Sequence, residues 1–300
     1  MNRFGAICVS TDGFLLIDKP GQWTSHDVVA KIRNLARLKK VGHAGTLDPM
    51  ATGLLVLGLG KATRLLRFVQ SFPKEYVATA RFGVGTDSLD ADGEVTERIS
   101  MSVTADDLAA SLTKFRGPIR QTPPMKSAVR VGGRRLYEIA REGGEVERPS
   151  REVEIYELEL IDFVPGEFPE VGLRVVCSSG TYIRTLADDI ARTLGGPGHL
   201  TALRRTRNGS LDVADAASID QLAEDPDSLW QRVLTPAAGL ADLGAVMIDD
   251  ALAERVAHGA VLDPTEVAIA DTMALVDGAG RLLAVYRQDG DRLKPEVVLS

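Results

Sequence analysis

A glycine-bracketed Asp-Pro turn that leads straight into an apolar run constrains this chain more than any other stretch. Residues 41–63 read VGHAGTLDPMATGLLVLGLGKAT. Pro49 biases Asp48 away from helical geometry, while Gly45 and Gly53 permit backbone shapes that other residues resist. The apolar run at 54–59 predicts a buried strand. From these residues alone, Asp48 is either a turn residue before that strand or a carboxylate presented on a shaped loop.

The distribution of charge leaves nucleic-acid binding open. The 300 residues carry 35 Lys+Arg and 42 Asp+Glu, a net charge of -7. Residues 1–210 hold 29 Lys+Arg against 25 Asp+Glu, whereas residues 211–300 hold 6 against 17. A phosphate backbone responds to local positive surface, not to the charge of the whole chain. The acidity of the last third therefore does not exclude RNA binding by the first part.

Length and cysteine content limit the class of protein. Three hundred residues predict a large domain plus a small one. Two cysteines are too few for a disulfide framework or a cysteine-rich zinc site, which favours a reducing compartment. The apolar patch near the N-terminus is shorter than a signal peptide, and no apolar run reaches the roughly 20 residues of a membrane span. We expect a cytoplasmic protein.

Hydrophobic periodicity predicts the elements around the turn. A capping pattern at Thr24–Asp27 opens a helix to about residue 40, and alternation from residue 74 to 82 predicts a strand that puts Lys74 and Tyr76 on one face. Further helices are expected at 63–72, 103–115 and 185–194, antiparallel strands at 153–163 and 171–177, a polar helical connection at 210–242, and short strands at 267–269, 273–276 and 282–286.

Three familiar motifs fail on geometry or spacing. Ser25-His26-Asp27 cannot form a hydrolase triad, because consecutive helical residues point in different directions. The glycines at 58–60 lack the spacing of a phosphate-binding loop, and Ala62 follows the lysine where Ser or Thr is required. The acidic run at 86–93 lacks the carboxylate that a calcium loop needs at its twelfth position.

Two stretches carry positive side chains suited to RNA or to a carboxylate. Residues 116–141 hold seven Lys/Arg among prolines and glycines, with Tyr137 nearby and one acidic residue, so a loop that contacts an RNA backbone is predicted beside the alternative of a solvated loop. If the strand before residue 180 persists, Tyr182 and Arg184 project from one face. An arginine beside a carboxylate keeps it ionised. The alternative for Arg184 is a surface salt bridge.

Separate motifs, in the correct order along the chain, resemble those of the tRNA pseudouridine synthase B family. GTLDPMATGLL at 45–55 resembles the family's G-x-L-D-P-x-A-x-G-L-L signature, and Lys19-Pro20 its N-terminal K-P motif. Similar matches are the K-x-Y pair at 74–76, P-P-x-x-S-A at 123–128, S-x-G-T-Y-I-R-T-L at 178–186 and H-L-x-x-L-R-R at 199–205. The resemblance covers roughly residues 13–207.

The resemblance implies an α+β fold with a mixed, mainly antiparallel sheet and flanking helices, plus a small β-rich C-terminal domain. We expect a pseudouridine synthase catalytic domain at 1–240, with the basic RNA-gripping insertion at 116–141, and a PUA-like domain at 243–300. It also implies isomerisation of uridine 55 in the T-arm of tRNA to pseudouridine. That reaction needs no cofactor, no metal and no obligatory protein partner.

The family's motifs also imply roles for individual residues. Asp48 is the nucleophile, which either attacks the ribose or takes a sugar proton, and Arg184 orients it with Asp90 as a second partner. Tyr76 is the third expected catalytic residue, with proton transfer as its candidate role. His43 fills the space of the flipped nucleotide, Tyr76 and Leu203 hold the uracil, and Tyr182 shapes the pocket. Two lysines complete the expected substrate contacts: Lys19, which supports the loop, and Lys126 of the insertion.

Two other classes of protein remain open at this point. One is an RNA-binding or tRNA-folding module that uses the same pocket without catalysis. The other is a guide-RNA-dependent synthase of a ribonucleoprotein, whose members carry a basic C-terminal extension, in contrast to the acidic residues 211–300. Activity on a bare tRNA transcript separates these alternatives.

Overall fold

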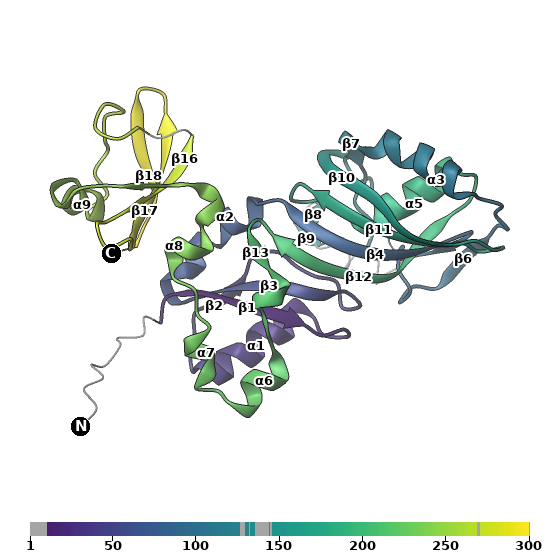
Figure 1. The fold of residues 1–300 in the computed structure, drawn as a ribbon, viewed down its shortest axis with the longest axis horizontal. Coiled ribbons are helices and arrows are strands. Elements are labelled where there is room, and N and C mark those ends of the chain that lie inside the picture. The colour runs from purple at the N-terminus through teal and green to yellow at the C-terminus, as the bar shows by residue number, and fades with distance from the viewer. Residues whose placement is uncertain are drawn as a thin grey trace. The chain divides into compact units, whose positions relative to one another are not determined.

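The chain forms two compact units. The computed structural model describes residues 11–126, 130–131, 133–135, 144, 146–268 and 271–299. The first unit comprises Met1–Pro49, Gly53–Phe72 and Asn208–Ser300, and the second comprises Met50–Thr52 and Pro73–Arg207. Figure 1 shows the elements of each unit along the chain.

The first unit begins with two apolar strands. In it β1 (Gly13–Lys19) pairs antiparallel with β3 (Thr52–Leu59) and parallel with β14 (Ala217–Ser218), and β2 (Val41–His43) pairs with β3. Strands β1 and β3 are buried almost throughout, which explains their continuous apolar sequence. The predicted strand at 54–59 is confirmed.

Helix α1 (Ser25–Ala36) follows β1 and starts where the capping pattern predicts. The Thr24 side chain accepts from the Asp27 backbone N–H, and the Asp27 carboxylate accepts from the Thr24 backbone N–H. The helix ends before residue 40, because Arg37 adopts a left-handed conformation with φ 52° and closes it. The predicted helix at 63–72 is divided into a 3-10 turn, η1 (Gly60–Leu65), and α2 (Leu66–Ser71).

The last third of the chain first winds through short helical segments. These are η3 (Val213–Asp215), α6 (Ile219–Glu224), α7 (Ser228–Gln231), α8 (Pro236–Gly239) and η4 (Ala241–Leu243). The structure confirms the predicted helical connection, although as separate turns. The backbone of Leu234 bonds that of Phe14 in both directions, at 2.8 and 2.9 Å, which ties the connection to β1.

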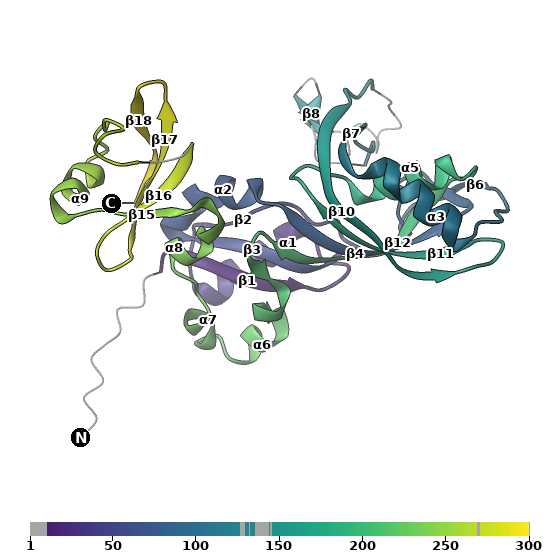
Figure 2. The same cartoon turned by 45° about the horizontal axis from the view of Figure 1, so that its top comes forward.

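A four-stranded sheet with one helix ends the first unit. Its order is β15 (Ala245–Met247), β16 (Thr272–Val276), β17 (Leu282–Asp289) and β18 (Arg292–Val298), and α9 (Asp250–Ala257) packs on β17 and β18 (Figure 2). The strand expected at 267–269 is wrong for residues 267 and 268, which are not in a strand, and residue 269 lies outside the described residues.

Helix α2 and the C-terminal sheet share one buried apolar cluster. Its members include Leu65 and Val69 on the helical side and Val276, Val285 and Val297 on the sheet side. Two arginines add polar contacts: Arg64 donates to the Val298 carbonyl at 2.6 Å, and Arg67 donates to the Glu296 carbonyl at 3.0 Å and to its carboxylate at 2.5 Å. The small sheet is therefore packed against the rest of the first unit.

The second unit is built on a largely antiparallel sheet. Its strands lie in the order β12 (Gly198–Asn208), β4 (Lys74–Phe82), β11 (Glu170–Cys177), β10 (Arg151–Val164) and β7 (Gly117–Gln121). Side chains of β4 alternate between buried and exposed, and β10 pairs antiparallel with β11, as predicted. Helices α3 (Ala105–Leu112) and α5 (Ile183–Thr193) pack on this sheet, and η2 (Thr113–Phe115) follows α3.

The basic segment is more ordered at its start than a loop. Strand β7 extends the sheet along β10, and β8 (Arg130–Val131) pairs with β9 (Arg134–Arg135) in the same segment. Before this segment, β5 (Val84–Thr86) pairs with β6 (Val95–Arg98). The prediction of a loop over 116–141 is therefore wrong for residues 117–121, 130–131 and 134–135, which lie in strands. Residues 127–129, 132 and 136–141, with Tyr137, lie outside the described residues.

The fold class predicted from the sequence is confirmed: mainly antiparallel strands with flanking helices, plus a small β-rich C-terminal sheet. None of the helices in the described ranges is long and apolar enough to cross a membrane. The domain boundary at 240–243 stays a prediction.

Candidate functional site

The backbone on both sides of Asp48 is fixed by the turn between β1 and α1. Ser25 Oγ accepts from the Leu47 backbone N–H at 2.9 Å and lies 3.3 Å from the Leu47 carbonyl. On the other side, the Pro49 carbonyl accepts from the Gln22 backbone N–H at 2.8 Å. The Asp48 side chain between these anchors is half-buried. A carboxylate held this way has a defined place at the surface of the first unit.

Gly45 explains how the chain enters this loop. Its φ is 113°, in the region that side chains strongly disfavour. After it, Leu47 is buried while Thr46 and Pro49 stay exposed. The buried side chain of Leu47 therefore anchors the loop, and Thr46 and Pro49 lie on its exposed side.

Lys19 supports the loop from inside. Its side chain is fully buried, and Nζ donates to the carbonyls of Trp23 at 2.6 Å, Pro20 at 2.9 Å and Pro49 at 3.2 Å. One ammonium thus ties the end of β1 to the residue after Asp48. This geometry fits the loop-supporting role expected of Lys19, whose contact with substrate stays a prediction.

His43 ends β2 and lies half-buried on the same unit as Asp48. Its ring meets the ring of His26 edge to face, with centroids 5.6 Å apart and planes at 78°. From the sequence, His26 was expected only as part of a helix cap. Its contact with His43 was not visible from the sequence, because 17 positions separate the two residues along the chain.

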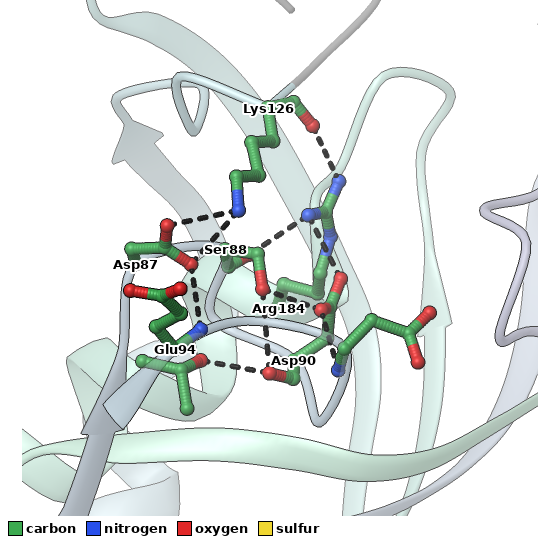
Figure 3. Close-up of polar contacts among 8 residues, drawn as sticks. Asp87, Ser88, Asp90, Glu94, Lys126 and Arg184 are labelled. Carbon is green, nitrogen blue, oxygen red and sulfur yellow. Dashed lines mark hydrogen bonds and ion pairs between the residues drawn. The ribbon is translucent and has the colours of Figure 1, made fainter. Parts of the chain in front are cut away.

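Arg184 forms the centre of a buried network in the second unit (Figure 3). Its Nη1 lies 3.0 Å from Asp90 Oδ2 and donates to the Ser88 carbonyl at 2.8 Å, and its Nη2 donates to the Lys126 carbonyl at 2.9 Å. The side chains of Arg184 and Asp90 are 4% and 7% exposed. A buried pair of opposite charges is retained only when further hydrogen bonds satisfy both groups. The expected partnership of Arg184 with Asp90 is confirmed.

Asp90 is held by its own loop. Ser88 Oγ donates to Asp90 Oδ1 at 2.5 Å, the Asp92 backbone N–H donates to the same oxygen at 3.2 Å, and Thr86 Oγ1 donates to the Asp90 carbonyl at 2.8 Å. The run at 86–93 that partly imitates a calcium loop therefore serves as a clamp on a carboxylate that faces an arginine.

The route by which Arg184 reaches this network differs from the sequence prediction. Strand β11 ends at Cys177, as expected, and Arg184 lies in the first turn of α5, so the condition of a strand that persists through Arg184 is not met. Tyr182 is the N-cap of this helix but supplies no side-chain cap. Instead the Gln121 side chain accepts from the Tyr182 N–H at 3.0 Å and donates to its carbonyl at 3.2 Å.

The remaining predicted contacts of the second unit lie on three elements. Tyr76 is half-buried on β4, and Leu203 is buried on β12. Tyr182 is half-buried, with the guanidinium of Arg151 4.7 Å from its ring centroid. Asp48 belongs to the first unit and these residues to the second, so the joining of the two sets stays a prediction.

Buried cations in the second unit were not anticipated. Lys74 and Arg205 are 5% and 1% exposed, and Lys74 pairs in register with Cys177. Burial, and secondly the charge of Arg205, lower the pKa of Lys74 to about 8. The signal was available in the alternation of β4, because the face that carries Lys74 also carries the buried Ala78 and Phe82.

No group of three or more His, Cys, Asp or Glu side chains suited to a metal ion occurs within the described ranges.

Comparison with known proteins connects both units to one family. Residues 33–183 match the family model of the TruB family pseudouridylate synthase (N terminal domain). Residues 184–269 match the tRNA pseudouridylate synthase B C-terminal domain, and residues 243–300 match tRNA Pseudouridine synthase II, C terminal.

Individual relatives agree over most of the chain. The chain is 49% identical to a tRNA pseudouridine synthase B of Symbiobacterium thermophilum, over 83% of this chain and 82% of the relative. It is 43% identical to that of Thermobifida fusca, over 96% and 99%. Among solved structures, a chain of a Cbf5-Nop10-Gar1 complex matches with a TM-score of 0.75 at 27% identity, covering 97% of this chain and 85% of that one.

Proposed function

Because the chain belongs to the TruB family of pseudouridylate synthases, we propose that it converts uridine to pseudouridine in tRNA, at position 55 of the T-arm. The catalytic residues belong to residues 1–240, with the insertion at 116–141 on the tRNA, and residues 243–300 form a PUA-like domain. The observation that carries this proposal is the loop of Asp48, whose backbone is anchored on both sides while its carboxylate stays half-buried.

The reaction breaks the bond between ribose C1' and uracil N1 and forms a bond between C1' and C5. The proton on C5 leaves and N1 gains one, so the change is an isomerisation without redox chemistry or hydrolysis. Asp48 acts on the sugar, either by attacking C1' or by taking a sugar proton. Both routes require the carboxylate to be ionised, and in this proposal Arg184, which also pairs with Asp90, orients it.

The target uridine of the T-arm must leave its stack to meet Asp48. Extrusion costs a few kcal/mol, which contacts in the pocket offset. Tyr76 and Leu203 hold the flipped base, Tyr182 shapes the pocket and His43 occupies the space that the base vacates. Lys19 maintains the loop beneath Asp48.

The test is tritium release from tRNA transcript labelled at C5 of uridine. Asp48→Asn removes the charge but keeps the size, so we expect release to fall to background while filter binding of tRNA is retained. Asp106→Asn on the exposed face of α3 is the matched control and should behave as the parent. Turnover by Asp48→Asn would refute the assignment.

Two further measurements address the alternatives. Release from a bare transcript, lost when the T-arm is deleted, supports an enzyme that needs no guide RNA. Binding without release by the parent protein supports the RNA-folding alternative.

Arg184→Lys keeps the charge but loses the planar fork that reaches Asp90 and two carbonyls, so a large loss of turnover is expected.

A further inference from the structure

Lys126 contacts the Arg184 network with both its backbone and its side chain. Its carbonyl accepts from Arg184 Nη2 at 2.9 Å, and its Nζ lies 2.9 Å from each carboxylate oxygen of Asp87. Figure 3 shows the two contacts on opposite ends of the residue. Residue 126 is therefore clamped between an arginine and an aspartate that lie on different elements.

Asp87 is itself a fixed partner. Its Oδ1 also accepts from the Glu94 backbone N–H at 3.1 Å, and its own backbone N–H donates to the Glu94 carbonyl at 3.1 Å. A side chain at Gly93 would lie 2.5 Å from Asp87 Oδ1 and 2.2 Å from Ser88 Oγ, so it would displace both groups from these positions. The ammonium of Lys126 is thus bound to a loop, residues 87–94, that its own hydrogen bonds hold in place and that serves as a platform.

The same platform holds the other side of Arg184. Ser88 and Asp90 bind Nη1 from this loop, whereas the carbonyl of Lys126 binds Nη2. A planar guanidinium is oriented by the acceptors at its two ends. The pair Lys126–Asp87 joins those two sets of acceptors, so it determines where the second one lies.

We propose that Lys126 is a positioning residue for Arg184, held in place by Asp87, and not a phosphate contact of the tRNA. This inference rests on the proposed function, in which Arg184 acts with Asp48. An ammonium shared between two carboxylate oxygens is already neutralised, which weakens its attraction for phosphate. The pair is 43% and 42% exposed, so it contributes little to global stability, and its effect is expected in turnover.

The experiment compares Lys126→Met, Asp87→Asn and the charge-swapped double variant Lys126→Asp with Asp87→Lys, on tRNA transcript at two salt concentrations. We expect each single variant to lower kcat about three- to tenfold with KM within about twofold of the parent, and the swap to restore at least part of the loss. Lys114→Met, an exposed lysine on η2, is the control and should leave both constants unchanged.

A phosphate contact gives a different pattern. Lys126→Met would then raise KM and reduce the slope of log KM against log salt by about one, with kcat unchanged, and Asp87→Asn would not lower kcat. That pattern, or parent-like constants in both single variants, overturns the proposal.

A spectroscopic measurement separates this inference from the proposed function. The guanidinium NMR signals of Arg184, assigned by their loss in Arg184→Lys, should show an Nη2–H protected from exchange in the parent and exposed in Lys126→Met and Asp87→Asn. If the parent releases no tritium, the proposed function fails and these spectra alone decide the positioning role. Unchanged protection in both variants refutes it.

Discussion

Replacing Lys19 with methionine tests whether one buried ammonium holds the turn around Asp48. Methionine keeps most of the stem but removes three donors. Among the described residues, the Pro49 carbonyl retains a bond from the Gln22 N–H, whereas the carbonyls of Pro20 and Trp23 accept from Lys19 alone. Each partly buried carbonyl left without a donor costs about 1 to 2 kcal/mol. We expect Lys19→Met to lower the free energy of unfolding by about 2 to 4 kcal/mol.

The assay uses the position of a natural fluorophore. The chain has two tryptophans, so Trp230→Phe leaves Trp23, whose carbonyl is one of the three acceptors, as the single reporter. Urea unfolding followed by its emission gives the free energy, and tritium release gives turnover, which we expect to fall with the loop. Lys114→Met is the control and should stay within about 0.5 kcal/mol of the parent. A Lys19→Met variant with parental stability and parental emission would show that the ammonium does not organise this turn.

Two other predictions concern the pH dependence of stability and the packing of a glycine. Burial lowers the pKa of Lys74 to about 8, so between pH 8 and its unfolded value the unfolded chain binds more protons and the free energy of unfolding rises with pH. Above pH 9 the raised pKa of buried Cys177 opposes this rise. We therefore expect the free energy of unfolding, measured with urea, to increase by about 1 kcal/mol from pH 8 to 9 in the parent and not in Lys74→Met. The same pH dependence in the two proteins would contradict this prediction. A side chain at Gly239 would lie 2.0 Å from the ring of the buried Phe14, so Gly239→Ala should cost about 1 to 3 kcal/mol. Gly166→Ala, with open space around it, should be nearly neutral, and similar losses in the two variants would rule out the steric argument.

Local signals predicted those parts of the fold that are held locally. The cap of α1 lies within four residues, Thr24 to Asp27, and the alternation of β4 follows from its own side chains. The start of α5 was missed because Tyr182 offers no side-chain cap, and its backbone is satisfied by Gln121, 61 positions earlier. A partner at that distance leaves no mark in the sequence around the helix.

In the candidate site, too, contacts between residues that are distant along the chain could not be predicted from local sequence. The glycines and the proline beside Asp48 left two interpretations open, and only the motif that contains Asp48 made it a predicted site residue. The partnership of Arg184 with Asp90 was likewise expected from the motifs and is observed. The ion pair of Lys126 could not be predicted from the sequence, because its partner, Asp87, lies 39 positions earlier. In the sequence, Lys126 is one of the cations of the basic segment, and charge alone does not distinguish an ion-paired lysine from a solvated one.

The apolar cluster shared by α2 and the C-terminal sheet restricts how the chain can be cut or recombined. Removing residues 243–300 would strip Val276, Val285 and Val297 from Leu65 and Val69, and would leave Arg64 without the Val298 carbonyl. A truncated protein would then be prone to self-association for reasons unrelated to RNA. Chimaeras that exchange this segment between relatives should therefore carry the matching α2 sequence with it.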